Sequence, residues 1–248
     1  MVEKIIKFIS VFVIILLSTI VVSVCENYAF GFFSKSFFFG SFFILTRFAL
    51  IFFVFLLTQS ISYKEIVLCR KNTALLFYIV PMLGLGAFFS INYFTRAIEL
   101  IVNGKTYFPI GITTDFLSAL VISPVCEEIV YRALILTYFL KIYSTGRAIV
   151  LTAVLFSFFH FLPTLNLYAF ISPFCGGLLL SWLFMKTKNL LIPILVHSCF
   201  NGLIIAYPYW RLFIFKFSDA ISIMELVIAL TLGLIFLILS IHIINRNR

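Results

Sequence analysis

Charged residues are scarce in this chain. Only 11% of its 248 residues are Asp, Glu, Lys or Arg, whereas soluble globular proteins carry about 25%. So few charged side chains do not cover a water-facing surface, and the composition excludes an ordinary soluble domain. The net charge of +9 suggests nucleic acid at first sight. The basic residues, however, stand singly or in pairs between apolar runs and form no basic stripe, so we expect no nucleic-acid partner.

Cysteine pairs with metal-binding or redox spacing are also missing. The five cysteines lie far apart and none belongs to a C-x-x-C motif, so we interpret them as small buried apolar residues. A signal-peptide cleavage site is missing as well. The first apolar run follows Lys4 and Lys7 but ends at Val22-Ser23-Val24, which lacks the small residues that such a site needs. We therefore expect a retained first membrane span.

Long apolar runs fill most of the sequence. Hydrophobic residues make up 63% of it, Phe occurs 33 times, and the mean hydropathy is +1.20. A helix needs about 20 apolar residues to cross a bilayer. The runs predict an all-α fold, a polytopic membrane helix bundle of about eight transmembrane helices, with 1–248 as a single membrane domain. The predicted spans are 5–24, 39–60, 74–95, 115–140, 147–163, 168–185, 190–208 and 222–244, with the longest polar connection over 96–115.

The distribution of Lys and Arg predicts the orientation of this bundle. Eight spans place both termini on one side, and that side carries roughly eleven basic residues against about six on the other. Because cytoplasmic loops are enriched in Lys and Arg, we expect a multi-pass protein of the cell membrane with both termini in the cytoplasm.

Ionisable residues inside the predicted spans are the exception to this apolar pattern. Such a residue costs about 2.5–3.5 kcal/mol at the bilayer centre on insertion scales, so it usually has a function. In the span 115–140, Glu128 and Arg132 are four residues apart and share a helix face, which favours an ion pair. Glu127 is rotated by about 100° and points elsewhere. A buried ion pair without chemistry is the alternative, but it leaves Glu127 unexplained.

Two further spans carry histidines. His160 follows Phe156 by four residues, and taken alone it is more often a hydrogen-bonded core residue than a base or ligand. His197 and Asn201 are also four residues apart, so the imidazole and the amide share one face. That face suits donation to one oxygen or metal binding by His197, and polar contacts between helices are the alternative. Together, a carboxylate, two imidazoles, an Arg and an amide suit the activation of water and the stabilisation of an oxyanion.

These motifs resemble the CAAX-protease and bacteriocin-processing (CPBP, or Abi) family of intramembrane proteases. The family pattern is E-E-x-x-x-R, then F-x-x-x-H, then H-x-x-x-N or H-x-x-x-D, in the order and spacing found here. Gly176-Gly177, Asn189-Leu190 and Pro193-Ile194 also resemble the family's landmarks, so we expect a catalytic core over 123–202.

The resemblance also implies a role for each polar residue. Glu127 is expected to be the general base, with His160 holding the attacking water, and His197 and Asn201 are expected to stabilise the oxyanion. Glu128 and Arg132 are expected to brace the helix. Members are commonly labelled metalloproteases, and Glu127, His160 and His197 form a candidate ligand set for a divalent metal such as zinc. A water activated by glutamate without metal is the competing description, and Asn201 is a poor zinc ligand.

The leading functional hypothesis is thus an intramembrane endopeptidase that cleaves a membrane-associated peptide or protein. Maturation of a bacteriocin or pheromone, self-immunity, and CAAX-type C-terminal processing are the candidate roles, and the partners are membrane lipid and a peptide or protein substrate. A non-catalytic immunity or regulatory protein that binds its partner through its helices is the alternative. A transporter or proton relay also uses intramembrane Glu and His, but the sequence shows no symmetry between two halves. The sequence leaves the oligomeric state open.

Overall fold

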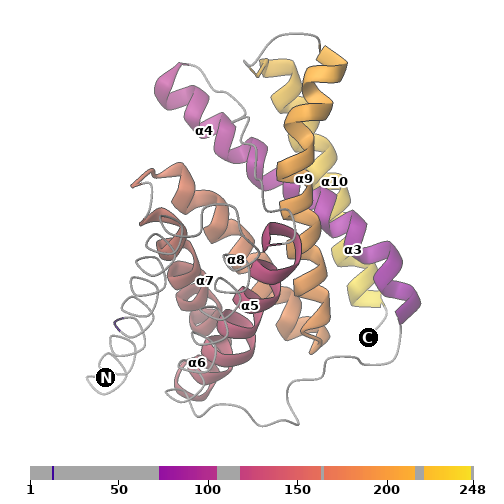
Figure 1. Cartoon of the computed structure of the whole chain (residues 1–248). Coiled ribbons are helices and arrows are strands. Elements are labelled where there is room, and N and C mark those ends of the chain that lie inside the picture. The colour runs from indigo at the N-terminus through magenta and orange to yellow at the C-terminus, as the bar shows by residue number, and fades with distance from the viewer. Residues whose placement is uncertain (1–12, 14–72, 105–117, 163–164, 216–220, 247–248) are drawn as a thin grey trace, which may run out of the picture.

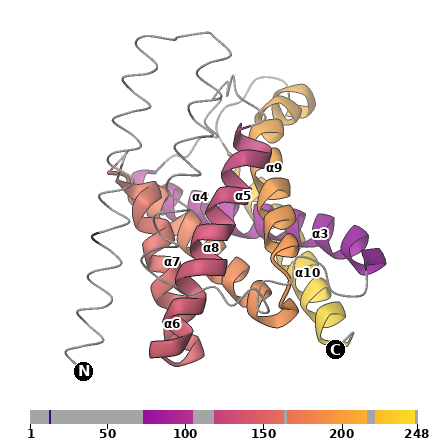
Figure 2. The ribbon, with the colours of Figure 1, turned by 60° about the horizontal axis from the view of Figure 1, so that its bottom comes forward.

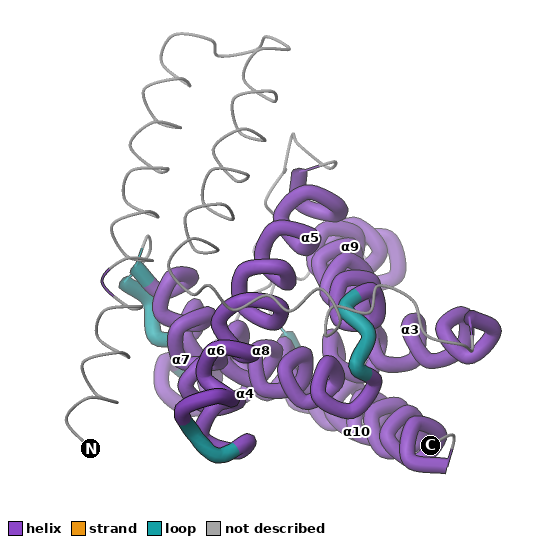
Figure 3. Tube along the Cα trace, turned by 90° about the horizontal axis from the view of Figure 1, so that it is seen from below, coloured by secondary structure: helices purple, strands orange, loops and turns teal. Residues whose placement is uncertain are grey.

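The computed structural model describes residue 13 and residues 73–104, 118–162, 165–215 and 221–246. This part of the chain is built from helices and short connections and contains no strand (Figure 3). The all-α prediction is confirmed for these residues. The predicted spans 5–24 and 39–60 lie outside them.

Eleven helical segments follow one another in the described residues. They are α3 (Thr73–Ala87), η1 (Phe88–Asn92), α4 (Tyr93–Asn103), η2 (Ser118–Ile122), α5 (Ser123–Glu128), η3 (Ile129–Leu136), α6 (Thr137–Ile142), α7 (Thr145–Phe161), α8 (Tyr168–Thr187), α9 (Leu191–Phe215) and α10 (Ile223–Arg246). The three η segments are π-helices, in which each turn holds an extra residue. Directly adjoining segments form two continuous rods, α3–η1–α4 and η2–α5–η3–α6.

Each of the six predicted spans from 74–95 onward falls on a helix or on one of the rods. Within the described residues, three helices are long and apolar enough to cross a membrane, namely 79–103, 168–187 and 223–246. The apolar helices therefore indicate a membrane protein, although they do not establish eight spans. The polar connection predicted over 96–115 is wrong in its first half. The rod continues to Asn103 and ends at Gly104, whose φ of 70° stops the helix.

The helices form two packed groups that meet at the candidate site. In Figures 1 and 2, α5, α6, α7 and α8 lie together, and the α3–η1–α4 rod crosses α9 and α10 on the other side. Helices α7 and α8 pack along each other, α3 packs on α9 and α10, and α9 contacts both α8 and α5. Helix α9 therefore joins the two groups.

Small residues allow the backbones of these helices to approach closely. A Cβ placed on Gly177 of α8 would lie 3.1 Å from both Cα and Cβ of Ala153 on α7. A Cβ on Gly233 of α10 would lie 2.5 Å from the backbone nitrogen of Ser90 in η1. Membrane helices lack a hydrophobic driving force between them, so contacts of this kind stabilise their association.

The short connection between α8 and α9 fixes the start of α9. Lys188 ends α8 with a φ of 52°, and the Asn189 side chain then accepts a hydrogen bond of 2.9 Å from the Leu191 backbone N–H. An Asn side chain in this position satisfies a backbone donor that the first helical turn leaves without a partner. The side chain of Asn189 thus caps the start of α9, about two turns before His197.

Candidate active site

Glu128 and Arg132 form a fully buried ion pair on the α5–η3 rod. Arg132 Nη1 lies 2.7 Å from Glu128 Oε1, and neither side chain is exposed at all. The guanidinium also donates from Nη2 to the Gly177 carbonyl at 3.4 Å and lies 4.8 Å from the centre of the Phe156 ring. The ion pair inferred from the i,i+4 spacing is therefore present. It also ties the rod to α8 and α7, which the spacing did not indicate.

His197 brings α9 to the same carboxylate. Its Nδ1 lies 2.8 Å from Glu128 Oε1, the oxygen that also accepts from Arg132. A carboxylate paired with a guanidinium accepts hydrogen bonds, so Nδ1 of His197 carries a proton. This arrangement fixes the ring and directs Nε2 away from Glu128.

His160 is oriented in the same way by a different partner. Its Nδ1 lies 2.8 Å from the Phe156 carbonyl, one turn earlier on α7. A carbonyl only accepts, so the proton of a neutral His160 is on Nδ1 and its Nε2 holds a lone pair. The Phe156 ring packs between the histidines, with centroid distances of 4.6 Å to His160 and 5.9 Å to His197. The four-residue spacing of Phe156 and His160 thus has a local structural reason in this chain.

Glu127 lies where the two imidazoles meet. Its Oε2 is 3.9 Å from Nε2 of His160 and 3.9 Å from Nε2 of His197. Among the described residues this oxygen has no hydrogen-bond partner, and the side chain is 18% exposed. A separation of 3.9 Å is too long for a direct hydrogen bond but suits two groups that share one water. Helices α5, α7 and α9 therefore direct three titratable side chains towards one place.

Asn201 lies one turn after His197 but is tied to another element. Its Nδ2 donates to the Ala119 carbonyl in η2 at 3.0 Å. One N–H of the amide is used in this way, and an amide nitrogen has two. The shared face of His197 and Asn201 agrees with the prediction, because both line the same cavity. Donation by both side chains to one oxygen is not seen directly, because His197 already bonds Glu128 and Asn201 already bonds Ala119.

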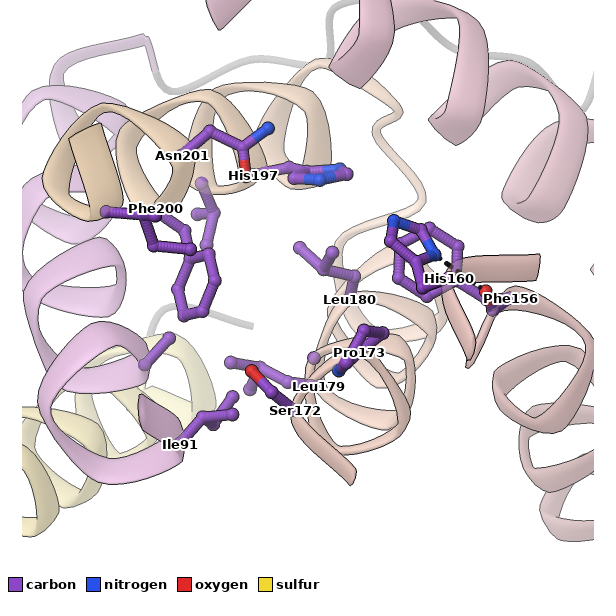
Figure 4. A pocket seen from close by; sticks show the side chains of 14 residues that line it. Ile91, Phe156, His160, Ser172, Pro173, Leu179, Leu180, His197, Phe200 and Asn201 are labelled. Carbon is purple, nitrogen blue, oxygen red and sulfur yellow. Dashed lines mark hydrogen bonds between the residues drawn. The ribbon is translucent and has the colours of Figure 1, made fainter. Parts of the chain in front are cut away.

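That cavity, which we call the apolar chamber, has a volume of about 140 Å³ (Figure 4). Both histidines and Asn201 lie at one end of it, and its other walls come from α3, η1, α7, α8 and α9. The apolar and small residues of those walls are Ala87, Ile91, Phe156, Ser172, Pro173, Gly176, Leu179, Leu180, Val196, Phe200 and Ile204. Glu127 is not among the lining residues and reaches the chamber through the histidines.

A second, larger cavity adjoins the chamber at His160, Ser172, Pro173 and Ile204. We call it the polar vestibule. Its volume is about 550 Å³, and its polar lining residues include Asn92, Thr95, Arg96, Glu99, Asn166 and Tyr168. Arg96 and Glu99 form an ion pair of 2.7 Å in this wall. The path from the vestibule to the histidines therefore changes from polar to apolar.

The sequence interpretation missed the vestibule wall on the α3–η1–α4 rod. Asn92 is only 8% exposed, lines the vestibule, and its Nδ2 has no hydrogen-bond partner among the described residues. One signal was available, because Asn92 is a polar residue within the predicted span 74–95. Its direction could not be predicted, since the π-helical turn of η1 shifts the helix face by one residue.

The arrangement does not match a tetrahedral zinc site. The described residues contain no group of three His, Cys, Asp or Glu side chains with metal-binding geometry. Zinc ligands lie at about 2.0–2.2 Å, which puts neighbouring donor atoms roughly 3.4 Å apart. The two distances of 3.9 Å from Glu127 to His160 and His197 are longer.

Comparison with known proteins supports one family. Residues 109–203 match the family model described as Type II CAAX prenyl endopeptidase Rce1-like. This stretch contains the whole polar cluster, and the match confirms the resemblance that the three motifs predicted. No curated protein and no solved structure matches the chain.

Proposed function

We propose that this chain is an intramembrane endopeptidase that hydrolyses a peptide bond with a water activated by Glu127. One observation carries the proposal. The partnerless Oε2 of Glu127 lies 3.9 Å from Nε2 of each histidine, while Nδ1 of each ring is occupied by another acceptor. A water between Glu127 and His160 donates one proton to the carboxylate and the other to the imidazole. Its oxygen lone pair is then free to attack.

The reaction follows from this placement. The water oxygen forms a bond to the carbonyl carbon while one water proton passes to Glu127 Oε2, and the C=O electron pair moves to the oxygen. When the carbonyl forms again, the C–N bond breaks and the amine leaves with the proton that Glu127 held. His160 keeps the water oriented in the first step. General acid–base catalysis of this kind contributes about 10²–10⁴-fold.

His197 and Asn201 are the proposed donors to the oxyanion. A donor to the oxyanion must itself carry a proton. Because Glu127 and His160 accept both protons of the water, His197 Nε2 has to carry an additional one. The charges favour this state. Glu127 and Glu128 carry two negative charges against one positive charge on Arg132, and a second proton on His197 makes the buried cluster neutral. Asn201 donates its second N–H, because its first is held by Ala119.

The two cavities support a membrane-associated peptide as substrate. A polar backbone reaches the histidines through the vestibule, and an apolar side chain is accommodated by the chamber. Maturation of a bacteriocin or pheromone precursor, self-immunity, and CAAX-type processing all supply such peptides. Phe occurs 33 times and Ile is also abundant, which is compatible with an AT-rich bacterium, where prenylated substrates are less expected, and this favours peptide maturation or self-immunity.

The test compares three variants in membranes that contain the full chain. Glu127→Gln and His160→Ala are expected to abolish cleavage of a candidate precursor while the protein level stays unchanged. His242→Ala is the matched control, because His242 is exposed on α10 and far along the chain from the site. Full retention of the biological phenotype by the two site variants would overturn the peptidase proposal. It would support the non-catalytic immunity or regulatory protein instead.

The orientation is proposed separately. We place both termini in the cytoplasm of a cell-membrane protein, because the Lys and Arg bias favours that side. A reporter that works only in the cytoplasm is expected to be active when it is fused after Arg248. Activity of an exported reporter at that position would reverse the orientation.

A further inference from the structure

The apolar chamber ends at the two histidines but is closed at its side by one helix, α8. The α8 residues in its wall are Ser172, Pro173, Gly176, Leu179 and Leu180. Spacings of four, seven and eight residues from Ser172 place this set on one helix face. Gly176 is at the middle of the face and contributes no side chain. The empty space of the chamber therefore lies next to the position on α8 where a side chain is missing.

The two adjacent glycines of α8 have different surroundings. A Cβ on Gly177 would meet Ala153 at 3.1 Å and the Phe156 ring at 3.3 Å, so Gly177 is needed for the packing of α7 against α8. A Cβ on Gly176 would meet no described heavy atom within 4 Å. Helix packing therefore gives no reason for a glycine at 176. A glycine in a helix interior also costs roughly 0.5–1 kcal/mol relative to alanine.

We propose that the apolar chamber binds one bulky apolar side chain of the substrate next to the scissile bond, and that Gly176 sets the size of that side chain. This inference rests on the proposed peptidase function. The volume identifies the ligand class, because an apolar cavity of about 150 Å³ binds benzene and the chamber measures about 140 Å³. One Phe, Leu or Met side chain fills such a space. A long isoprenoid chain would extend beyond it.

The position of the chamber explains why this side chain matters for cleavage. His160, His197 and Asn201 line one end of it, so a side chain seated in it holds the adjacent peptide bond near the water and the oxyanion donors. Orientation of this kind lowers the barrier of the reaction as well as improving binding. Gly176 acts through the substrate side chain and touches no reacting atom.

The experiment uses a graded series at position 176 and a set of matched peptides. Gly176→Ala, Gly176→Val and Gly176→Leu fill the chamber in steps, and the peptides differ only in carrying Phe, Leu or Ala beside the cleaved bond. We expect kcat/KM for the Phe peptide to fall by roughly tenfold or more in Gly176→Leu, because a pocket discriminates by about 10–200-fold per methylene. The Ala peptide is expected to change by no more than about threefold. Gly146→Leu is the control, since a Cβ on Gly146 also meets no described atom and Gly146 lies at the exposed start of α7.

Equal losses for all three peptides in Gly176→Leu would overturn the inference, because they would indicate a general packing defect. Unchanged cleavage of all three would also overturn it. If the unsubstituted protein cleaves peptides but shows no size preference at any position, the inference fails while the peptidase proposal stands.

A binding measurement separates the two proposals further. A peptide with a diazirine analogue of leucine in place of the bulky residue is expected to crosslink to α8 in the Glu127→Gln protein, and Gly176→Leu is expected to remove that crosslink. Crosslinking that persists in Gly176→Leu would overturn the inference. Crosslinking to α8 without any cleavage by the unsubstituted protein would refute the peptidase proposal and leave a binding pocket for an apolar side chain.

Discussion

Two polar clusters join the helices of this bundle, and they differ in how their hydrogen-bonding groups are matched. In the first, Glu127, His160 and His197 direct one Oε2 and two Nε2 atoms towards one place beside a cavity. In the second, the hydroxyl groups of Tyr93 and Tyr207 bond each other and both reach Oε1 of Glu225, at 2.9 and 3.3 Å.

The second cluster matches donors to an acceptor and joins α4, α9 and α10. Among the described residues that line the chamber or the vestibule, none belongs to it. Polar residues in membrane helices are costly unless they are paired, and this cluster is paired. The first cluster leaves Oε2 of Glu127 without a partner, as expected of a group that binds a water or substrate. A glutamate therefore joins helices through paired hydrogen bonds in the second cluster, whereas we propose that a glutamate of the first cluster activates water.

Glu127→Gln tests the comparison most strongly. Gln keeps the shape of the side chain but is not a base, so kcat is expected to fall by roughly 10²–10⁴-fold. The thermal unfolding temperature in detergent is expected to stay unchanged, because Glu127 Oε2 has no described hydrogen-bond partner to lose. A clear drop in that temperature would indicate that Glu127 stabilises the fold.

Arg132→Met tests the buried ion pair of Glu128 and Arg132 beside the first cluster. Removing one partner leaves Glu128 charged and buried, which is expected to lower the free energy of unfolding by about 3–5 kcal/mol. Detergent unfolding and membrane protein levels measure the effect. The double variant Glu128→Gln with Arg132→Met is the control and is expected to recover part of the loss. If the single variant is as stable as the original chain, the ion pair does not brace the rod.

Asn201→Leu tests the proposed oxyanion donor. Loss of one such donor lowers kcat by about 10²–10³-fold in other acyl-transfer enzymes, and we expect a similar loss here with little change in KM. Steady-state cleavage kinetics separate the two parameters. A rise in KM with unchanged kcat would instead assign Asn201 to substrate binding.

Glu225→Gln and Tyr207→Phe test the second cluster and are expected to have the smallest effects. Each removes or weakens hydrogen bonds worth about 1 kcal/mol, so the unfolding temperature should fall slightly. Cleavage rates are expected to remain within about twofold of the original value. A loss of cleavage comparable to that of Asn201→Leu would show that the second cluster also positions the site.

Removal of divalent metal completes the comparison. Because 3.9 Å separates Glu127 from each histidine, we expect cleavage to survive incubation with a chelator, and purified protein to contain less than one metal per chain. Metal content before and after His197→Ala measures the second quantity. Loss of cleavage that zinc restores would favour Glu127, His160 and His197 as metal ligands.

Most of the helices could be predicted from the sequence because their signal is local. Apolar runs near 20 residues long indicated the described helices and rods from residue 74 onward, and the i,i+4 spacing indicated the pair of Glu128 with Arg132. The end of α4 was misplaced because Arg96 and Glu99 look like loop residues. They are helical because they pair with each other and line a cavity, which removes them from lipid.

The sequence by itself determined that this chain belongs in a membrane, that three of its predicted spans carry polar motifs, and which residues of those motifs share a helix face. Only the tertiary structure decided that His197 bonds Glu128, that Asn201 bonds Ala119, and that both histidines turn Nε2 towards Glu127. The reason is that helix periodicity fixes directions around one axis. The packing of α7 on α8, through contacts such as Gly177 on Ala153, and of α9 on both α8 and α5 fixes which of those directions converge.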